Sequence, residues 1–347
     1  MLEIQYKKVI YKVILSGYQN ININCGIQID IVFDETDTTD IEGISCKTPL
    51  ISGESGNCNN GEYMTHPAFI SMNTTGFWVG KFETGYRGAT SVSSAQVNGN
   101  DSSKVVLKPN VYSWRNITVY NAFLASYNYN RNLDSHMMKN TEWGAVAYLS
   151  HSKYGTNKEV NNNNNNLFKT GYSSLPSVSQ QTYPGTSGDN DTVNSAYNTE
   201  TGYLASTTGN VSGVYDMSGG SWEYMSAYII GKPGSSAFNT ATLASYDSKY
   251  FDIDATGEMG PFKQFSDGDN TSRYHSNWYN NLSNFVSSSN SWLIRSGLYN
   301  NGILSGMFFF NQYNGENNND GSFRIVLTVN NIKREFAFFY MSKIVNL

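Results

Sequence analysis

Two long polar stretches limit what this chain can fold into. Residues 155–210, which include the run Asn161 to Asn166, and residues 231–291 show little apolar periodicity. Stretches of this length in a compact domain are functional loops or disordered segments rather than helices or strands. The aromatic residues scattered through 231–291 indicate that parts of that stretch pack against the core. We therefore expect a loop-rich fold in which few regular elements carry the structure.

The regular elements expected from periodicity lie outside those stretches. Period-two alternation predicts strands at 27–33, 76–84 and 322–329, and apolar runs predict two more at 291–297 and 306–312. Helical spacing predicts two helices: one is capped by Thr118 and runs to about Asn128, and one is capped by Asn140 or Thr141 and ends at Gly155. Strands at both ends with helices between them predict an α+β fold.

Charge and composition exclude several classes of function. Charged residues are 15% of the chain, against about 25% in a usual soluble domain. The net charge of −5 and the lack of basic clusters argue against a nucleic-acid partner. No apolar run approaches the roughly 18 residues of a membrane span, and we do not interpret the N-terminus as a signal peptide. The surface must be rich in Asn, Ser, Thr, Gly and Tyr, which suits adaptable recognition but also fits a simple bias in amino-acid usage.

The three cysteines all precede residue 60. Cys46 and Cys58 flank a turn-rich loop, and a disulfide between them would suit an extracellular protein, with Cys25 left over. Three free thiols in a reducing compartment are the alternative.

The stretch GVYDMSGGSWEYM, residues 213–225, places two acids on either side of a Gly-Gly turn. Asp216 and Glu223 could supply carboxylates, and Gly219 and Ser221 carbonyl oxygens, to a hard cation such as Ca²⁺. A purely structural turn is nearly as well supported by the residues. Acid–base catalysis is the third reading, and no His lies nearby in sequence to support it.

This stretch resembles the G-L-Y-D-M-x-G-N-V-W-E-W signature of the formylglycine-generating enzyme, or sulfatase-modifying factor, family. Three further segments resemble motifs of that family in the same order: PNVYSWRNITVYNAFLASYN (109–128), MMKNTEWGAVAYLS (137–150), and WLIRSGLYNN with NNNDGSFRIVL (292–301 and 317–327). The resemblance implies a C-type-lectin-like fold with small antiparallel sheets, two helices and long loops. It also implies a structural Ca²⁺ held by Asp216, Gly219, Ser221 and Glu223. We expect the domain over 61–328, a β-rich attachment segment at 1–60 and a tail at 329–347.

The resemblance fails where catalysis should lie. Members that are enzymes use a C-terminal cysteine pair to bind copper, and this chain has no Cys after residue 58. A soft thiolate pair is what a copper(I) site needs, so we expect no enzymatic activity. An oxidase of the formylglycine-generating kind is the weakest alternative.

The chain more closely resembles a non-catalytic branch, the variable proteins of diversity-generating retroelements, which sit on phage tails or bacterial surfaces. In that branch the residues just before the final G-F-R-x-V strand vary, and here that window is 297–323, whose Asn and aromatic residues suit a binding face. The resemblance implies a protein or glycan receptor on another cell, and an extracellular, cell-surface or virion location. The residues expected to contact ligand are Tyr299, Asn300, Asn301, Leu304, Phe308, Phe310, Asn311 and Tyr313. Phe309 is expected in the core. The alternative is a structural subunit, such as a minor pilin or a tail component, in a homo-oligomer or larger assembly.

Overall fold

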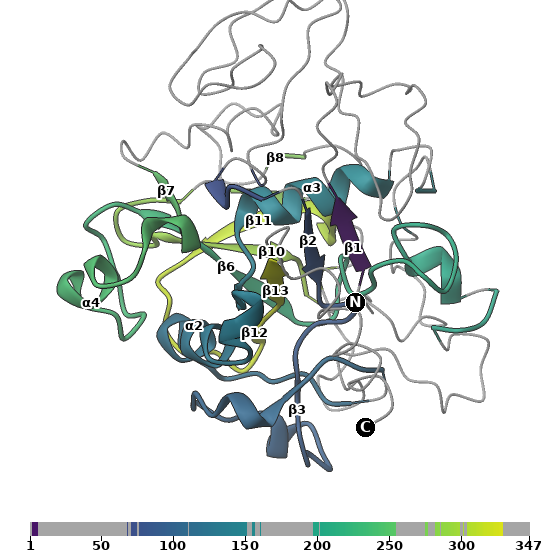
Figure 1. Ribbon diagram of the computed structural model, residues 1–347, viewed down its shortest axis with the longest axis horizontal. Coiled ribbons are helices and arrows are strands. Elements are labelled where there is room, and N and C mark those ends of the chain that lie inside the picture. The colour runs from purple at the N-terminus through teal and green to yellow at the C-terminus, as the bar shows by residue number, and fades with distance from the viewer. Residues whose placement is uncertain are drawn as a thin grey trace, which may run out of the picture.

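The computed structural model describes three long ranges, 76–150, 197–254 and 282–328, with short gaps, and small pieces within 2–5, 68–74, 155–160 and 275–276. These residues form a mixed arrangement of three sheets and a few helices (Figure 1), which confirms the α+β class. The strand expected at 27–33, all three cysteines and most of the expected terminal segments lie outside the described residues. None of the described helices is long and apolar enough to cross a bilayer.

The largest sheet has the strand order β12-β6-β10-β11-β9-β8, with β7 also paired to β6. Its antiparallel centre is made of β6, β10 and β11, while β12 and β7 run parallel to β6 and β9 runs parallel to β11. The strands are β6 (Trp222–Ile229), β7 (Asp252–Asp254), β8 (His275–Ser276), β9 (Leu282–Ser283), β10 (Trp292–Ser296), β11 (Gly306–Tyr313) and β12 (Gly321–Phe323). The sheet is therefore more mixed than the antiparallel arrangement expected from the sequence.

A second sheet has the order β1-β2-β13-β5, and all its pairs are antiparallel. Its strands are β1 (Leu2–Gln5), β2 (Gly76–Val79), β5 (His136–Met137) and β13 (Ile325–Thr328), and a separate pair is formed by β3 (Gly85–Tyr86) and β4 (Val105–Val106). The single strand expected over 322–329 is divided at Arg324 into β12 and β13, which belong to different sheets. Arg324 thus lies at the junction of the two sheets.

The two expected helices form. In α2 (Val119–Tyr127) the Thr118 hydroxyl accepts a hydrogen bond from the Asn121 backbone N–H at 3.4 Å, as a capping residue should. The second helix, α3 (Asn140–Ser150), ends five residues before Gly155, and Asn140 is its first residue rather than its cap. A short helix α4 (Thr240–Ala244) lies in the stretch expected to be loop. Single 3₁₀ turns occupy Ser93–Ala95, Ser102–Lys104, Arg131–Leu133, Gly202–Ala205 and Ser248–Tyr250.

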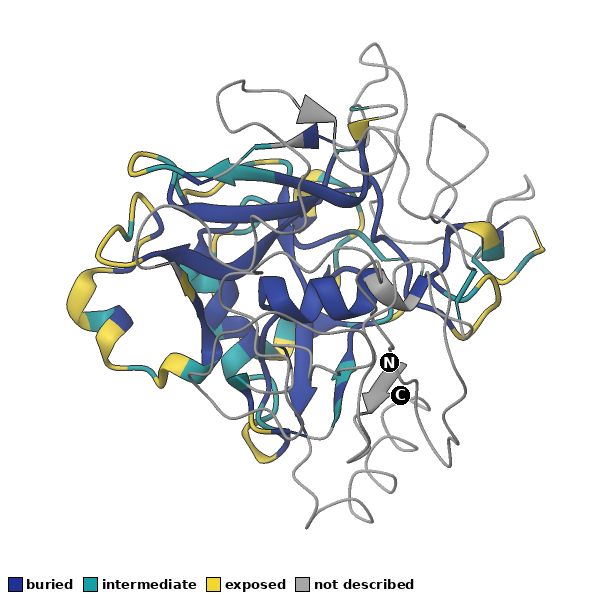
Figure 2. Cartoon of the chain, turned by 90° about the horizontal axis from the view of Figure 1, so that it is seen from above, coloured by how far each residue is buried: buried dark blue, intermediate teal, exposed yellow. Residues whose placement is uncertain are grey.

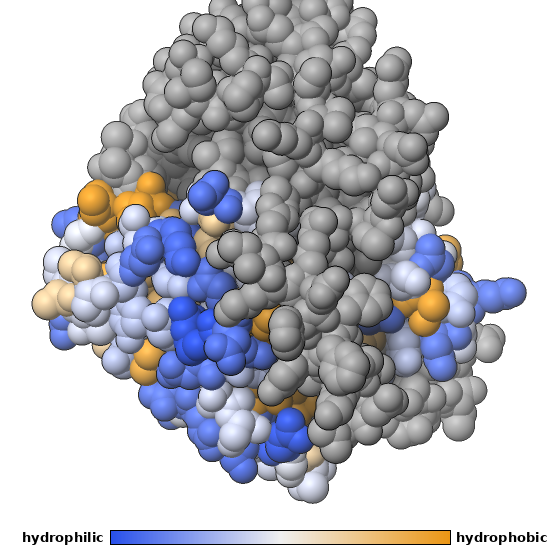
Figure 3. Space-filling model, viewed as in Figure 1, coloured by the Kyte–Doolittle hydropathy of each residue, from blue (hydrophilic) through white to orange (hydrophobic). Residues whose placement is uncertain are grey.

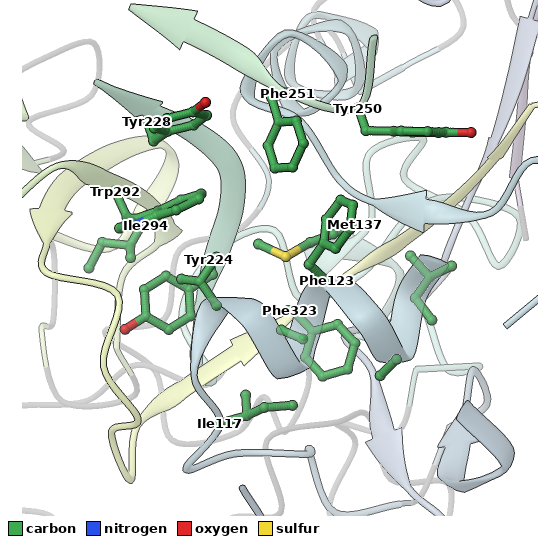
Figure 4. Close-up of a cluster of buried hydrophobic side chains, with 14 of the residues drawn as sticks. Ile117, Phe123, Met137, Tyr224, Tyr228, Tyr250, Phe251, Trp292, Ile294 and Phe323 are labelled. Carbon is green, nitrogen blue, oxygen red and sulfur yellow. The ribbon is translucent and has the colours of Figure 1, made fainter. Parts of the chain in front are cut away.

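Aromatic side chains fill the main core, between α2 and the large sheet (Figure 4). Tyr228 stacks on Trp292 with ring centroids 4.9 Å apart, and Phe123 of α2 stacks on Phe251 at 5.0 Å. Such pairs are worth about 0.5–1.5 kcal/mol each beyond the area they bury. Figure 2 shows the central strands and a central helix buried, with exposed residues mainly in peripheral loops and short helices. On the face in Figure 3, hydrophilic residues dominate the described surface and hydrophobic ones form small separate groups.

Candidate functional site

The signature turn at 213–225 leads directly into β6. Asp216, Gly219 and Gly220 have φ values of 58°, 76° and 76°, which lie in the left-handed region that favours glycine. The Gly-Gly pair is therefore needed for the backbone path, as the structural-turn interpretation requires. The turn delivers Glu223 to a position inside the protein where it is 0% exposed.

Glu223 is held by Arg324, which is also 0% exposed. The guanidinium Nε donates to Oε2 of Glu223 at 2.9 Å and its NH2 group donates to Oε1 at 2.5 Å, a bidentate pair. The same guanidinium donates to the carbonyl oxygens of Gly80 at 2.7 Å and Asp216 at 3.1 Å. Burial raises the pKa of Glu223, and Arg324 opposes that rise. One arginine thus joins β6, the signature turn, the end of β2 and the β12–β13 junction.

The residues assigned to Ca²⁺ by resemblance do not fit that ion well in this geometry. Both oxygens of Glu223 are engaged by Arg324, and Oδ2 of Asp216 accepts the Glu83 backbone N–H at 3.2 Å. The Gly219 carbonyl accepts the Ser296 hydroxyl at 2.6 Å, and Ser221 is buried at 2% exposed. Among the described residues there is no group of three or more His, Cys, Asp or Glu side chains arranged to hold a metal ion. For the Glu223 carboxylate to bind Ca²⁺ here, it would have to give up its hydrogen bonds to the guanidinium, which already supplies positive charge.

Glu83 is a third carboxyl group near this pair. Its Oε1 accepts the Ser113 hydroxyl at 2.6 Å, while Oε2 has no hydrogen-bond partner among the described residues. Burial raises the pKa of Glu83 well above its usual range, and the nearby charges of Asp216 and Glu223 raise it further. With Glu83 protonated, the cluster holds two carboxylates, Asp216 and Glu223, and one guanidinium, Arg324. All four groups are at most 1% exposed, so in this structure they are closed off from a substrate in solution.

A second buried polar cluster surrounds the start of α3. His136 places Nε2 2.9 Å from Oε1 of Glu142 and Nδ1 2.8 Å from the Asp134 carbonyl oxygen. The other Glu142 oxygen accepts the Lys139 backbone N–H at 2.9 Å, and Asp252 of β7 accepts the Thr141 N–H at 2.7 Å. These contacts satisfy orphan donors of the first turn, as in a capping box. For this helix the sequence predicted only a cap at Asn140 or Thr141, and it gave no signal for the pairing of His136 with Glu142.

The window expected to bind ligand is only partly exposed. Asn301, Asn311 and Tyr313 are half-buried and Leu304 is 41% exposed, while Tyr299 and Asn300 lie outside the described residues. Phe308 and Phe310 are 4% and 2% exposed, so in this structure they offer almost no surface to a ligand, and their expected role in binding stays a prediction. Every residue of β11 over 306–310 is buried, so both faces of the strand are covered there. Phe309 lies in the core, as expected.

Side chains of Asn284, Ser287, Asn311 and Gln312 form a hydrogen-bonded group, the amide cluster, on the outer edge of β11. Asn284 Nδ2 donates to Asn311 Oδ1 at 2.7 Å, and Gln312 Nε2 donates to Asn284 Oδ1 at 3.1 Å. The Ser287 hydroxyl donates to Gln312 Oε1 at 2.6 Å. Of these four residues only Asn311 was anticipated from the sequence. The amide residues give little signal in so Asn-rich a chain, and Asn284 joins the window only through its pairing with β11.

No protein-family model matches this chain, and a search of curated proteins finds no match either. The resemblance to the formylglycine-generating enzyme family therefore rests on the ordered sequence motifs alone.

Proposed function

We propose that this chain is a non-catalytic binding protein with a C-type-lectin-like fold, displayed on a bacterial surface or a phage particle. It recognises a receptor on another cell through the exposed part of the 297–323 window. The fold proposal is supported by two helices, α2 and α3, that flank sheets closed by the last strands of the domain. It is also supported by the buried Trp222–Glu223 and Arg324 residues of the resembling motifs.

The observation that carries the functional proposal is the contrast between the two candidate sites. The acids of the signature turn are engaged inside the protein, whereas the end of β11 carries half-buried Asn311, Gln312 and Tyr313 next to a buried run of phenylalanines. Binding surfaces use adaptable polar groups and aromatic rings held on a rigid base. β11 provides that base through its pairing with β10 over 292–296.

A binding screen with two matched variants tests the proposal. The labelled full chain is applied to arrays of purified cell-surface glycans and displayed extracellular protein domains. Leu304→Asp places a charge in the window, and Ile253→Asp places one on β7, at the opposite side of the sheet from β9. The two side chains are matched, being 41% and 40% exposed. We expect a receptor that binds the original chain and Ile253→Asp but binds Leu304→Asp at least tenfold more weakly. A chain that binds nothing, or equal loss in both variants, would overturn the proposal.

The structural-subunit alternative predicts a different result. If the chain is a subunit that mainly packs against copies of itself, Leu304→Asp would change the oligomeric state measured by light scattering. In that case neither the original chain nor the two variants would bind a receptor on the arrays.

A further inference from the structure

One backbone N–H determines which atom of each side-chain amide in the amide cluster is the oxygen and which is the nitrogen. The Gln312 backbone N–H donates to Asn311 Oδ1 at 2.8 Å, which fixes that atom as the acceptor oxygen of the side chain. Asn284 must then present its NH2 group to the same oxygen, and Gln312 must present its NH2 group to Asn284 Oδ1. Ser287 completes the series by donating to Gln312 Oε1. The orientation of three amides therefore follows from one backbone donor.

The amide cluster has more donors than its own hydrogen bonds use. Every amide oxygen in it already accepts at least one hydrogen bond. Among the described residues, Asn311 keeps both its amide N–H groups without a partner, and Asn284 and Gln312 keep one each. All three residues are half-buried, so each keeps part of its surface open to solvent while the hydrogen bonds hold its amide in place. The cluster is thus an uncharged array with a surplus of donors.

The same contacts disfavour an added peptide strand. β9 pairs with β11 at Phe310, and the Asn284 backbone N–H then donates to the Phe310 carbonyl at 3.0 Å. The next donor along this edge is the Gln312 N–H, which Asn311 has already satisfied. A peptide adding to an edge strand gains its affinity from free main-chain groups. Here it would have to break the contact that orders the cluster.

The charges around the amide cluster favour an uncharged ligand. Within the described part of the chain no Lys or Arg side chain hydrogen-bonds to the four residues of the cluster, and the whole chain carries a net charge of −5. An acidic ligand would gain no ion pair from these four side chains. Hydroxyl, ring and acetamido oxygens of a neutral sugar can each accept from an amide N–H, and the spare lone pairs on Asn284 Oδ1 and Gln312 Oε1 can accept from sugar hydroxyls.

We propose that the amide cluster of Asn284, Ser287, Asn311 and Gln312 is a binding site for a neutral glycan. This inference rests on the proposed function and specifies the ligand class of the same surface. It also adds residues outside the 297–323 window, because Asn284 and Ser287 contribute from the neighbouring segment.

Two near-isosteric substitutions test the site. Asn311→Asp keeps an oxygen that accepts from the Gln312 N–H and from Asn284, but replaces the two spare N–H donors with a second carboxylate oxygen. Gln312→Glu likewise keeps the acceptor for Ser287 and removes the donor to Asn284. Asn128→Asp is the control, because Asn128 is an exposed residue at the end of α2 and undergoes the same change of charge. Titration calorimetry would use the full chain with cellotriose, triacetylchitotriose and lactose as neutral probes. Sialyllactose is the acidic counterpart of lactose, and an extended peptide is the strand probe.

We expect at least one neutral probe to bind the original chain and Asn128→Asp equally, and to bind Asn311→Asp and Gln312→Glu about tenfold more weakly, the upper range for one hydrogen bond. Binding of sialyllactose or the peptide alone, no binding of any neutral probe, or unchanged binding by Asn311→Asp would overturn the inference. If a receptor from the array screen is lost in Leu304→Asp but kept in Asn311→Asp, the glycan site is wrong while the proposed function stands. If the array screen finds no receptor, the proposed function fails as well.

Discussion

Arg324 and Glu223 form a bidentate ion pair in which both side chains are 0% exposed, and this pair connects β6 to the junction between two sheets. Arg324 lies between β12 and β13, and Glu223 lies on β6. Each nitrogen of the guanidinium has a partner within the protein, including the backbone carbonyls of Gly80 and Asp216. A buried ion pair stabilises a protein only when its geometry is this complete, since desolvation opposes the attraction.

Removing one partner should therefore be costly. We expect Arg324→Met to lower the free energy of unfolding by about 3–5 kcal/mol, because it leaves the Glu223 carboxylate buried without a counter-ion. Urea denaturation followed by tryptophan fluorescence measures the effect. Arg324→Lys keeps the charge but cannot form the bidentate pair, so its free energy of unfolding should lie between those of the original chain and Arg324→Met. This variant keeps the test informative if Arg324→Met does not fold. Arg87→Met, at an exposed arginine that donates to the Ser103 carbonyl, is the control. A loss for Arg324→Met no greater than for Arg87→Met would contradict a structural role for the pair.

The same pair predicts the response to calcium. With Glu223 engaged by Arg324 and the Gly219 carbonyl engaged by Ser296, the turn should gain no stability from Ca²⁺. We expect the same thermal midpoint in EDTA and in millimolar calcium. A ligand that binds the native state at 100 times its Kd would add about 2.7 kcal/mol, so a calcium-dependent rise in the midpoint would return the turn to the metal-site prediction.

The sequence predicted the elements that have strong local signals and missed those set by contacts across the fold. Thr118 before an apolar helix identified α2, and the Gly-Gly pair identified the turn. The break at Arg324 could not be predicted, because Phe323, Ile325 and Leu327 alternate without interruption. The strand divides there through its partners, since β12 pairs with β6 whereas β13 pairs with β2.

The window at 297–323 shows the same limit. Phe308 and Phe310 alternate with Phe309, and a period of two suggests that one face of a strand is exposed. Their burial depends on what packs over the second face of the sheet, including the stack of Arg295 over Phe310 at 5.5 Å. The amide cluster was hidden for a related reason, since Asn284 meets Asn311 across 27 residues of sequence.

Glu83 predicts an unusual dependence of stability on pH. Its pKa is raised in the folded state, first by burial and then by Asp216 and Glu223. Above its ordinary pKa of about 4.3, the unfolded chain has lost this proton while the folded chain still holds it. The folded state then binds more protons, so stability falls as the pH rises through this range. Glu83→Gln removes that fall and still offers an oxygen to Ser113.

We therefore expect Glu83→Gln to gain stability relative to the original chain as the pH rises from 4 to 8. Urea midpoints at several pH values measure the difference, and Glu200→Gln, at an exposed carboxyl, provides the control. A difference between Glu83→Gln and the original chain that stays constant over this range would show that Glu83 is ionised in the folded protein.

Gly315 allows the cost of backbone conformation to be separated from the cost of crowding. Its φ is 86°, and an added Cβ would lie 2.6 Å from the Ser236 Cβ and 2.7 Å from Cδ1 of Trp292. The Gly315 carbonyl also accepts the Val119 N–H at 3.1 Å, at the start of α2. Gly88 has nearly the same φ, 84°, but nothing lies within 4 Å of its added Cβ. We expect Gly88→Ala to cost about 1–2 kcal/mol from left-handed strain alone.

Gly315→Ala should cost about 2–5 kcal/mol, because overpacking adds to the same strain. Urea denaturation of both variants gives the difference, and a change in the near-ultraviolet circular dichroism of Gly315→Ala that is absent from Gly88→Ala would report a change in aromatic packing. Equal losses in the two variants would mean that Trp292 and Ser236 yield to the methyl group without cost. The end of the binding window would then be less tightly packed against the aromatic core than the 2.6 and 2.7 Å approaches require.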